Sequence, residues 1–136
     1  MAIRIVVDRN QLPTIRPLIR ARAGMVVRQT AIRAVEHMKM AMRAPKHGRV
    51  YVRGGAIHRA SAPGEAPAVD TGNLWNSIQI DFPDELRAEV GVGAPYAPFL
   101  EYGTSKMAPR PFFWPAVDAV RSEFEESMRQ IVRIEP

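Results

Sequence analysis

A long amphipathic segment constrains the fold of this chain more than any other feature. From Ile15 to Met42, apolar residues recur at intervals of three and four, which is the spacing of a helix with one buried face. The apolar positions are Leu18, Ile19, Ala23, Val26, Val27, Ala31, Ile32, Val35, Met38 and Met42. Pro45 ends the pattern, because proline interrupts a helix. Such a helix needs a second layer against which to bury its apolar face.

The residues before this helix predict a strand and a helix start. Residues 2–7 (AIRIVV) are rich in Ile and Val, which favours a short strand. Asp8 or Asn10 then offers an N-cap, since a short polar side chain can accept a hydrogen bond from the first free N–H groups of a helix. Pro13 fits a first helical turn. Pro17 fits a helix interior poorly and predicts a kink or a late start.

The second half of the chain predicts a β-hairpin and a second helix. Residues 73–81 (NLWNSIQID) and 86–92 (LRAEVGV) alternate as half-buried strands do, with residues 82–85 (FPDE) as the turn between them. After an aromatic-rich linker, Pro115 fits the first turn of a final helix. The expected apolar stripe of that helix is Phe113, Ala116, Val117, Val120, Phe124, Met128 and Ile131, and its outer face carries Asp118, Glu123, Glu125 and Glu126.

Residues 45–70 separate the two halves and are rich in Gly, Pro and Ala. Within them, residues 49–60 (RVYVRGGAIHRA) predict a hairpin, because Gly54 and Gly55 can adopt the positive φ that a tight turn needs. Residues 61–70 (SAPGEAPAVD) predict extended, proline-stiffened chain. A loop of this length in a small domain is usually functional or disordered. We expect it to be mobile in the free subunit and to become ordered against a partner.

These elements predict an α+β fold in which a small antiparallel sheet is packed by one long N-terminal helix and one C-terminal helix. The 136 residues suffice for one domain, so we expect a single domain over 1–136 with a protruding loop at about 45–70. A hydrophobic content of 46% excludes a disordered chain. No apolar run approaches the roughly 18 residues of a membrane span, and no signal peptide begins the chain, so we expect a cytoplasmic origin.

Charge is spread unevenly along the chain. Residues 1–60 hold 13 Lys and Arg against two acids (net +11), whereas residues 61–136 hold six against 12 (net −6), which gives the chain its net +5. Such asymmetry indicates a nucleic-acid partner, self-association of unlike surfaces, or simply a solvated basic helix face. The basic half has the charge for phosphate contacts. It lacks a helix-turn-helix pattern, a zinc knuckle and the interleaved aromatics that stack on bases.

The sequence carries little that indicates catalysis. The absence of cysteine excludes disulfides, thiolate metal sites and cysteine nucleophiles. His37, His47 and His58 lack metal-ligand spacing, and no serine stands in G-x-S-x-G. Glu101 is the one acid set among aromatics; it is either a catalytic carboxylate or, more commonly, a carboxylate that ties down a turn. We therefore expect no enzyme, no metal and no cofactor.

One ordered set of short motifs resembles a known family. Residues 94–116 (APYAPFLEYGTSKMAPRPFFWPA) follow a strand ending in V-G, and the matching positions are Val90-Gly91, Tyr96-Ala97, Glu101, Gly103-Thr104, Pro109, Pro111-Phe112 and Pro115-Ala116. Upstream, a Pro/Gly run precedes Thr71-Gly72, Leu74 and Ser77-Ile78. This pattern resembles a bacteriophage tail-component family of tail-completion or head–tail joining proteins, over about residues 60–120. Trp114 departs from it, because the family more often has a polar or basic residue there.

The resemblance implies a structural virion protein of the phage neck. It would form a homo-oligomeric ring, with a hexamer favoured over a dodecamer, at the head-proximal end of the tail, as a tail terminator or head–tail connector. Its partners would be head-completion or adaptor proteins, tail-tube or tail-terminator proteins, and DNA that passes through the channel without sequence readout. Assembly would occur in the host cytoplasm, without a membrane. The motif residues would serve structure and assembly. The alternative is a small basic nucleic-acid-binding protein.

Two expectations concern the ring itself. The basic half of one subunit is expected to meet the acidic half of the next, because heterologous contacts in a ring join unlike patches. The loop is expected to reach a neighbouring subunit or the adjoining ring, or to line the DNA channel. Its candidate contact residues are Arg49, Tyr51, Arg53 and Arg59.

Overall fold

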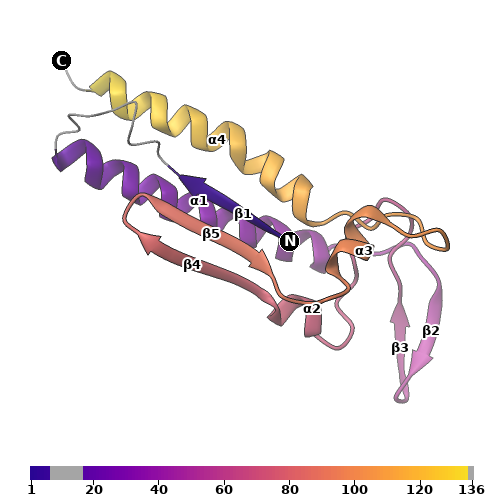
Figure 1. Ribbon diagram of the computed structural model, residues 1–136. Helices are drawn as coiled ribbons and strands as arrows, with labels where there is room; N and C mark the ends of the chain where they lie inside the picture. Colours follow the sequence, from indigo (N-terminus) through magenta and orange to yellow (C-terminus); the bar gives the residue numbers. More distant parts are fainter. Residues whose placement is uncertain (7–16, 135–136) are drawn as a thin grey trace.

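The computed structural model describes residues 1–6 and 17–134, and its fold is α+β, as the sequence predicts (Figure 1). A three-stranded antiparallel sheet has the order β1-β5-β4, and a separate two-stranded sheet joins β2 to β3. Helix α1 packs on the three-stranded sheet, and α4 packs along α1. The elements are β1 (Ala2–Val6), α1 (Pro17–Arg43), β2 (Val50–Arg53), β3 (Ala56–Arg59), α2 (Asn73–Asn76), β4 (Ile78–Asp84), β5 (Arg87–Val92), α3 (Ala97–Tyr102) and α4 (Phe113–Ile134).

Both long helices and the N-terminal strand are confirmed. Strand β1 pairs with β5 from Ala2–Gly91 to Val6–Arg87, which extends the predicted hairpin to three strands. Helix α1 is described from Pro17 onward, so the expected kink or late start at Pro17 stays a prediction. The N-cap expected at Asp8 or Asn10 and the first turn expected at Pro13 lie outside the described residues. None of the described helices is both long and apolar enough to cross a membrane.

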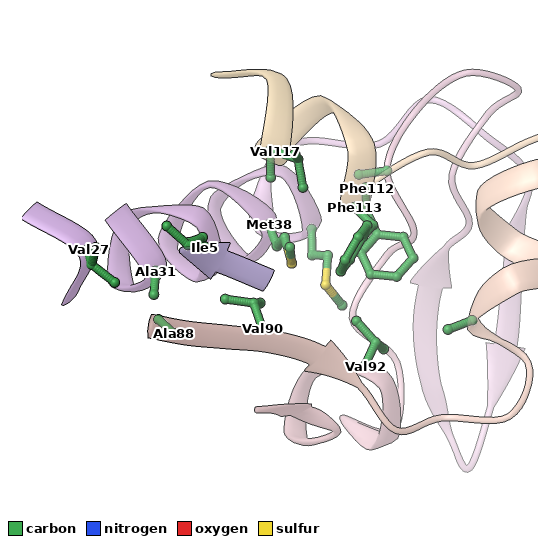
Figure 2. Close-up of a cluster of buried hydrophobic side chains, with 14 of the residues drawn as sticks. Ile5, Val27, Ala31, Met38, Ala88, Val90, Val92, Phe112, Phe113 and Val117 are labelled. Atoms are coloured by element: carbon green, nitrogen blue, oxygen red, sulfur yellow. The ribbon is translucent and has the colours of Figure 1, made fainter. Parts of the chain in front are cut away.

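The core lies between α1, the inner face of the sheet and the start of α4, as Figure 2 shows. In β5 the alternation is strict: Ala88, Val90 and Val92 are buried, and the residues between them are half-buried on the other face. Phe112 and Phe113 are the largest fully buried side chains. They fill one end of the core, because the first turn of α4 lies over the sheet.

The buried face of α1 differs in part from the predicted one. Leu18 and Ile32 are exposed, whereas Gly24, Thr30 and Ala34 are buried. The reason is close packing: small residues face the sheet and α4, so the two layers approach closely. A Cβ at Gly24 would lie 2.9 Å from the backbone oxygen of Glu85, in the turn that joins β4 to β5.

Two local predictions were wrong, and one element was not predicted. Residues 73–77 form a helical turn, α2, in place of a strand, because Gly72 adopts a left-handed φ of 84° and the Ser77 hydroxyl donates to the Leu74 carbonyl. Phe82, Pro83 and Asp84 continue β4 across a register shift between Asp81 and Asp84, which accommodates Pro83. The β4–β5 turn is therefore formed by Glu85 and Leu86 in place of residues 82–85. The aromatic linker contains a short helix, α3, with proline in its first turn.

The predicted hairpin at 49–60 is confirmed as β2 and β3. Gly54 and Gly55 form its turn with φ values of 58° and 79°, a conformation that side chains other than glycine rarely adopt. Figure 1 shows the β2–β3 hairpin projecting away from the helices and the three-stranded sheet. The protruding part of residues 45–70 is therefore a strand pair.

Replacing Phe113 by alanine tests the position of the core. Phe113 is completely buried, so Phe113→Ala should lower the free energy of unfolding by about 3–5 kcal/mol. Phe99 is 58% exposed, and Phe99→Ala should change the free energy of unfolding by less than about 0.5 kcal/mol. Urea unfolding followed by circular dichroism measures both. Equal effects of the two substitutions would contradict this placement of the core.

Candidate assembly site

The buried carboxylate of Glu101 joins α3 to the start of α4. Its Oε2 accepts hydrogen bonds from the backbone N–H groups of Phe112 and Phe113, at 2.8 and 2.9 Å, and its Oε1 accepts one from Trp114 at 2.9 Å. The side chain thus satisfies N–H groups that have no partner within the helix, and its negative charge lies at the positive end of the helix dipole. Of the two roles weighed for Glu101, the geometry supports the structural one.

A tight reversal follows Glu101 in the chain. Gly103 has φ 78°, and a Cβ there would lie 2.9 Å from the backbone oxygen of Met107 and the nitrogen of Pro109. Thr104 donates its N–H to the Met107 carbonyl at 2.9 Å, and its hydroxyl accepts from the Lys106 N–H at 3.2 Å. The motif residues Gly103 and Thr104 therefore form a tight turn between α3 and the segment that leads to α4.

The segment after this turn holds the base of the long loop. The Pro109 carbonyl accepts a hydrogen bond from the Gly64 N–H at 3.0 Å. The Arg110 N–H donates to the Leu100 carbonyl at 2.6 Å, and its guanidinium donates to the Ser61 hydroxyl at 3.1 Å. The family motif and the loop thus form one connected unit at this end of the molecule.

Glu65 fastens the loop from within. Its carboxylate accepts the N–H groups of Ala62 and His47, at 2.8 and 3.1 Å, and contacts the His47 ring. The hydrogen bond from Ala62, followed by those from His47, lowers the pKa of Glu65 to about 2. Nearby, Gly48 leaves no room for a Cβ, which would lie 2.4 Å from the Ala60 oxygen, so the two arms of the loop meet there.

The β2–β3 hairpin has two unlike faces. One face is polar and is tied to the body through Asp70, which accepts hydrogen bonds from Tyr51 (3.2 Å) and Arg53 (2.6 Å). Tyr51 stacks on His58, whose ring lies 3.8 Å from the same carboxylate. Burial, followed by the bond to Asp70, raises the pKa of Tyr51. The other face carries Val50, Val52 and Ile57, which are 47%, 70% and 78% exposed.

A groove of about 380 Å³ lies beside the polar face of the hairpin. It brings together Tyr51 and Arg53 of the hairpin with four motif residues, Thr71, Gly72, Leu74 and Tyr96. Arg49 and Arg59 do not line it; both are exposed, and Arg59 donates to the Gly48 carbonyl. The remaining motif residues lie outside this groove, in α3, in the α3–α4 connection and in the first turn of α4; they are Ala97, Glu101, Gly103, Thr104, Pro109, Pro111, Phe112 and Pro115.

Glu65 and Asp70 are functional residues that the sequence reasoning missed. They are the only acids in residues 45–70, a segment with a clear excess of cations. That isolation is the signal that could have identified them, because a lone acid among cations is well placed to pair with several of them. Asp70 holds the protruding hairpin, and Glu65 joins two segments of the loop at its base.

Most cations of α1 already have partners within the chain. Arg33 forms a two-point ion pair with Glu123 of α4, which raises the pKa of Arg33, and Arg20 pairs with Glu85 at 2.7 Å. The other partnered cations lie over aromatic rings: Arg28 over Phe82, and Lys39 and Arg43 over Trp75. Part of the charge asymmetry is therefore resolved by contacts between the two halves of one subunit.

Aromatic side chains lie exposed on and beside α3. Phe99 and Tyr102 are 58% and 61% exposed, and the Tyr102 hydroxyl accepts a hydrogen bond from the Trp114 indole at 2.7 Å. This bond gives Trp114, the position that departs from the family pattern, a defined partner. Within the described part of the chain, no group of three or more His, Asp or Glu side chains is placed to hold a metal ion.

Comparison with known proteins gives one match. A family model described as "Bacteriophage HK97-gp10, putative tail-component" matches residues 20–103. No curated protein and no solved structure matches the chain. The matched range covers α1, the hairpin, the three-stranded sheet except β1, and α3.

Removing the charge of Glu101 should destabilise the α3–α4 connection. Glu101→Gln keeps the size of the side chain but places a donor NH₂ group against backbone N–H groups. Because these groups are buried, we expect the free energy of unfolding to fall by about 2–4 kcal/mol. Glu126→Gln, on the exposed face of α4, is the control. Its free energy of unfolding should stay within about 0.5 kcal/mol of that of the unsubstituted protein. An unchanged free energy of unfolding for Glu101→Gln would refute the role of Glu101 in joining α3 to the start of α4.

The Glu65 contacts should make the loop sensitive to acid. Because folding lowers the pKa of Glu65 from 4.5 to about 2, its stabilising contribution is complete above pH 4.5 and is lost as the pH falls toward 2. The difference in unfolding free energy between the unsubstituted protein and Glu65→Gln should therefore shrink over this range. A difference that stays constant from pH 6 to pH 2.5 would contradict the hydrogen-bonding arrangement.

Proposed function

Because the chain belongs to the HK97-gp10-like family of bacteriophage tail components, we propose that it forms an oligomeric ring at the head-proximal end of the tail. The family makes it a structural component of the virion and implies a non-enzymatic role. In this ring the protein acts as a tail terminator or head–tail connector. A hexamer is the favoured assembly, with a dodecamer as the alternative.

The apolar face of the β2–β3 hairpin is the observation that carries this proposal. Val50, Val52 and Ile57 lie on one face of a projecting strand pair, and contacts with Asp70 hold the opposite face to the body. An apolar face held in an exposed position is characteristic of a surface that another molecule covers. In a closed ring every copy covers the hairpin of its neighbour.

The faces of the ring would contact the neighbouring components of the virion neck. On the head side these are head-completion or adaptor proteins, and on the tail side tail-tube or terminator proteins. DNA would pass through the channel without sequence readout, since cations contact phosphates regardless of sequence. Arg49 and Arg59 are the loop cations best suited to such contacts, because Arg53 is already engaged by Asp70.

The alternative of a nucleic-acid-binding protein receives no support from α1. Of its cations, Arg20 and Arg33 pair with acids, and three others lie over aromatic rings. A cation that is already paired within the chain gains less binding free energy from contact with a phosphate than an unpaired cation does. Contact between the basic and acidic halves of adjacent subunits remains part of the proposal, carried by the charges outside these pairs.

Deleting the hairpin tests the proposal in a phage that lacks this gene. Removal of residues 48–60 leaves the three-stranded sheet and both long helices untouched, so the protein should fold as a monomer that fails to assemble. Electron microscopy of the lysate should then show filled heads separate from tails. The control is Val52→Ile, which keeps the apolar face and should restore joined particles.

A deleted protein that still forms rings and joins heads to tails would reduce the hairpin to a passive insertion. An unsubstituted protein that stays monomeric at all concentrations and binds short duplex DNA tightly at physiological salt would favour the nucleic-acid-binding alternative instead.

A further inference from the structure

Strand β1 lies at one edge of the three-stranded sheet, and alternate backbone groups point away from β5. The Val92 N–H donates to the Met1 carbonyl, which defines residues 1 and 92 as a hydrogen-bonded pair. Since such pairs alternate along an antiparallel ladder, Ile3 and Ile5 also bond to β5. The N–H and C=O groups of Arg4 therefore face the outer edge of the sheet, with which no strand in residues 1–6 and 17–134 pairs; we call it the free edge of β1.

A groove of about 300 Å³ runs between this edge and α4. Four consecutive strand residues, 3–6, line it, although successive side chains of a strand point to opposite faces. Residues 3–6 can all line the same groove because the backbone edge of β1 forms one wall of it. The opposite wall is the apolar side of α4, made by Trp114, Val117, Val120 and Phe124.

The β2–β3 hairpin matches this groove in length and in apolar character. Strands β2 and β3 have four residues each, against five in β1. In the hairpin register Val52 stands opposite Ile57, so the exposed apolar side chains form one continuous face. That face is complementary to the apolar wall that α4 contributes to the groove.

Acidic side chains also lie beside the groove, whereas the hairpin segment is basic. Residues 46–60 carry Lys46, Arg49, Arg53 and Arg59 and no acid. On α4, Asp118 and Glu125 stand three residues before and four residues after Arg121, which lines the groove, so they flank it on the same side of the helix. Both acids are more than half exposed and pair within α4, Asp118 with Arg121 at 3.5 Å and Glu125 with Arg129 at 3.8 Å, so charge adds less to the match than the apolar side chains do.

We propose that the β1–α4 groove receives the β2–β3 hairpin of a second copy of this chain, which adds a strand to the free edge of β1. This proposal rests on the proposed ring, and it names the surface of the neighbour that the hairpin contacts. Backbone hydrogen bonds to the edge of β1 would supply affinity. The apolar side chains of the hairpin would fix how the added strand aligns with β1. Because hairpin and groove are different surfaces, the contact is heterologous and repeats around a closed ring.

Substitution of Arg4 by proline tests the edge directly. Arg4→Pro removes the outward N–H while leaving the hydrogen bonds of Ile3 and Ile5 to β5 in place, and proline is tolerated at such edge positions. Arg4→Ala is the matched control, because it also loses the exposed ion pair with Glu89 but keeps the N–H. We expect Arg4→Ala to assemble like the unsubstituted protein, and Arg4→Pro to remain a folded monomer by light scattering. Assembly of Arg4→Pro equal to that of Arg4→Ala would overturn the proposal.

Cross-linking gives a second test that does not depend on the stability of the proline variant. The chain has no cysteine, so Val52→Cys with Arg121→Cys introduces one thiol on the hairpin and one in the groove. Oxidation of the assembled protein should give a ladder of covalent oligomers on a denaturing gel. The control pair, Val52→Cys with Met25→Cys on the exposed side of α1, should give none.

The outcomes separate this proposal from the proposed function. Rings visible by electron microscopy without the Val52–Arg121 cross-link would overturn the groove as the docking site and leave the ring intact. A mixture of the two single-cysteine proteins should give covalent dimers only, which would support one hairpin per groove. Absence of any assembly under all conditions would overturn the proposed ring itself.

Discussion

The three hydrogen bonds from backbone N–H groups to the Glu101 carboxylate set the geometry on which the rest of the structure depends. They place the first turn of α4 against α3 and so deliver Phe112 and Phe113 into the core. From that point α4 runs along α1, and α1 covers the sheet. A buried carboxylate is unfavourable unless its charge is fully satisfied, and here the free N–H groups at the start of a helix satisfy it. The same connection holds the base of the loop through Pro109 and Arg110.

Charge is used mainly within the subunit. A chain with a basic first half and an acidic second half could leave two strongly charged surfaces, but α1 and α4 are neighbours in the fold. Arg33 and Glu123 therefore pair with each other, and other cations of α1 lie over Phe82 and Trp75. Exposed pairs of this kind contribute only about 0–1 kcal/mol each. These contacts occupy most cations of α1. The hairpin is then the main region where cations face solvent, because its two strands contain no acid.

In the assembly proposed above, the hairpin is an interaction surface that is already ordered in the free subunit. Asp70 engages the polar face through Tyr51 and Arg53, and Glu65 closes the loop below it. With these contacts formed, less conformational entropy is lost when the apolar face meets a partner.

The sequence by itself determined the class of fold, both long helices, the strand at 2–6 and the glycine turn of the hairpin. These features depend on local periodicity and on the φ requirements of Gly54 and Gly55, which a linear pattern contains. It also determined the family, through motifs whose order is visible along the chain. It did not determine that residues 73–77 form a turn of helix, because apolar alternation there competes with local hydrogen bonds of Ser77.

Only the tertiary structure decided which surfaces are free and which charges are paired. Leu18 and Ile32 continue the apolar period of α1 yet are exposed, because the width of the covered face depends on where the sheet and α4 lie. The partners of Glu101 are 11 or more residues away in sequence, and the pairs His47–Glu65 and Arg53–Asp70 are separated by 18 and 17 residues. No pattern along the chain contains such distances, since they arise when separate elements pack together.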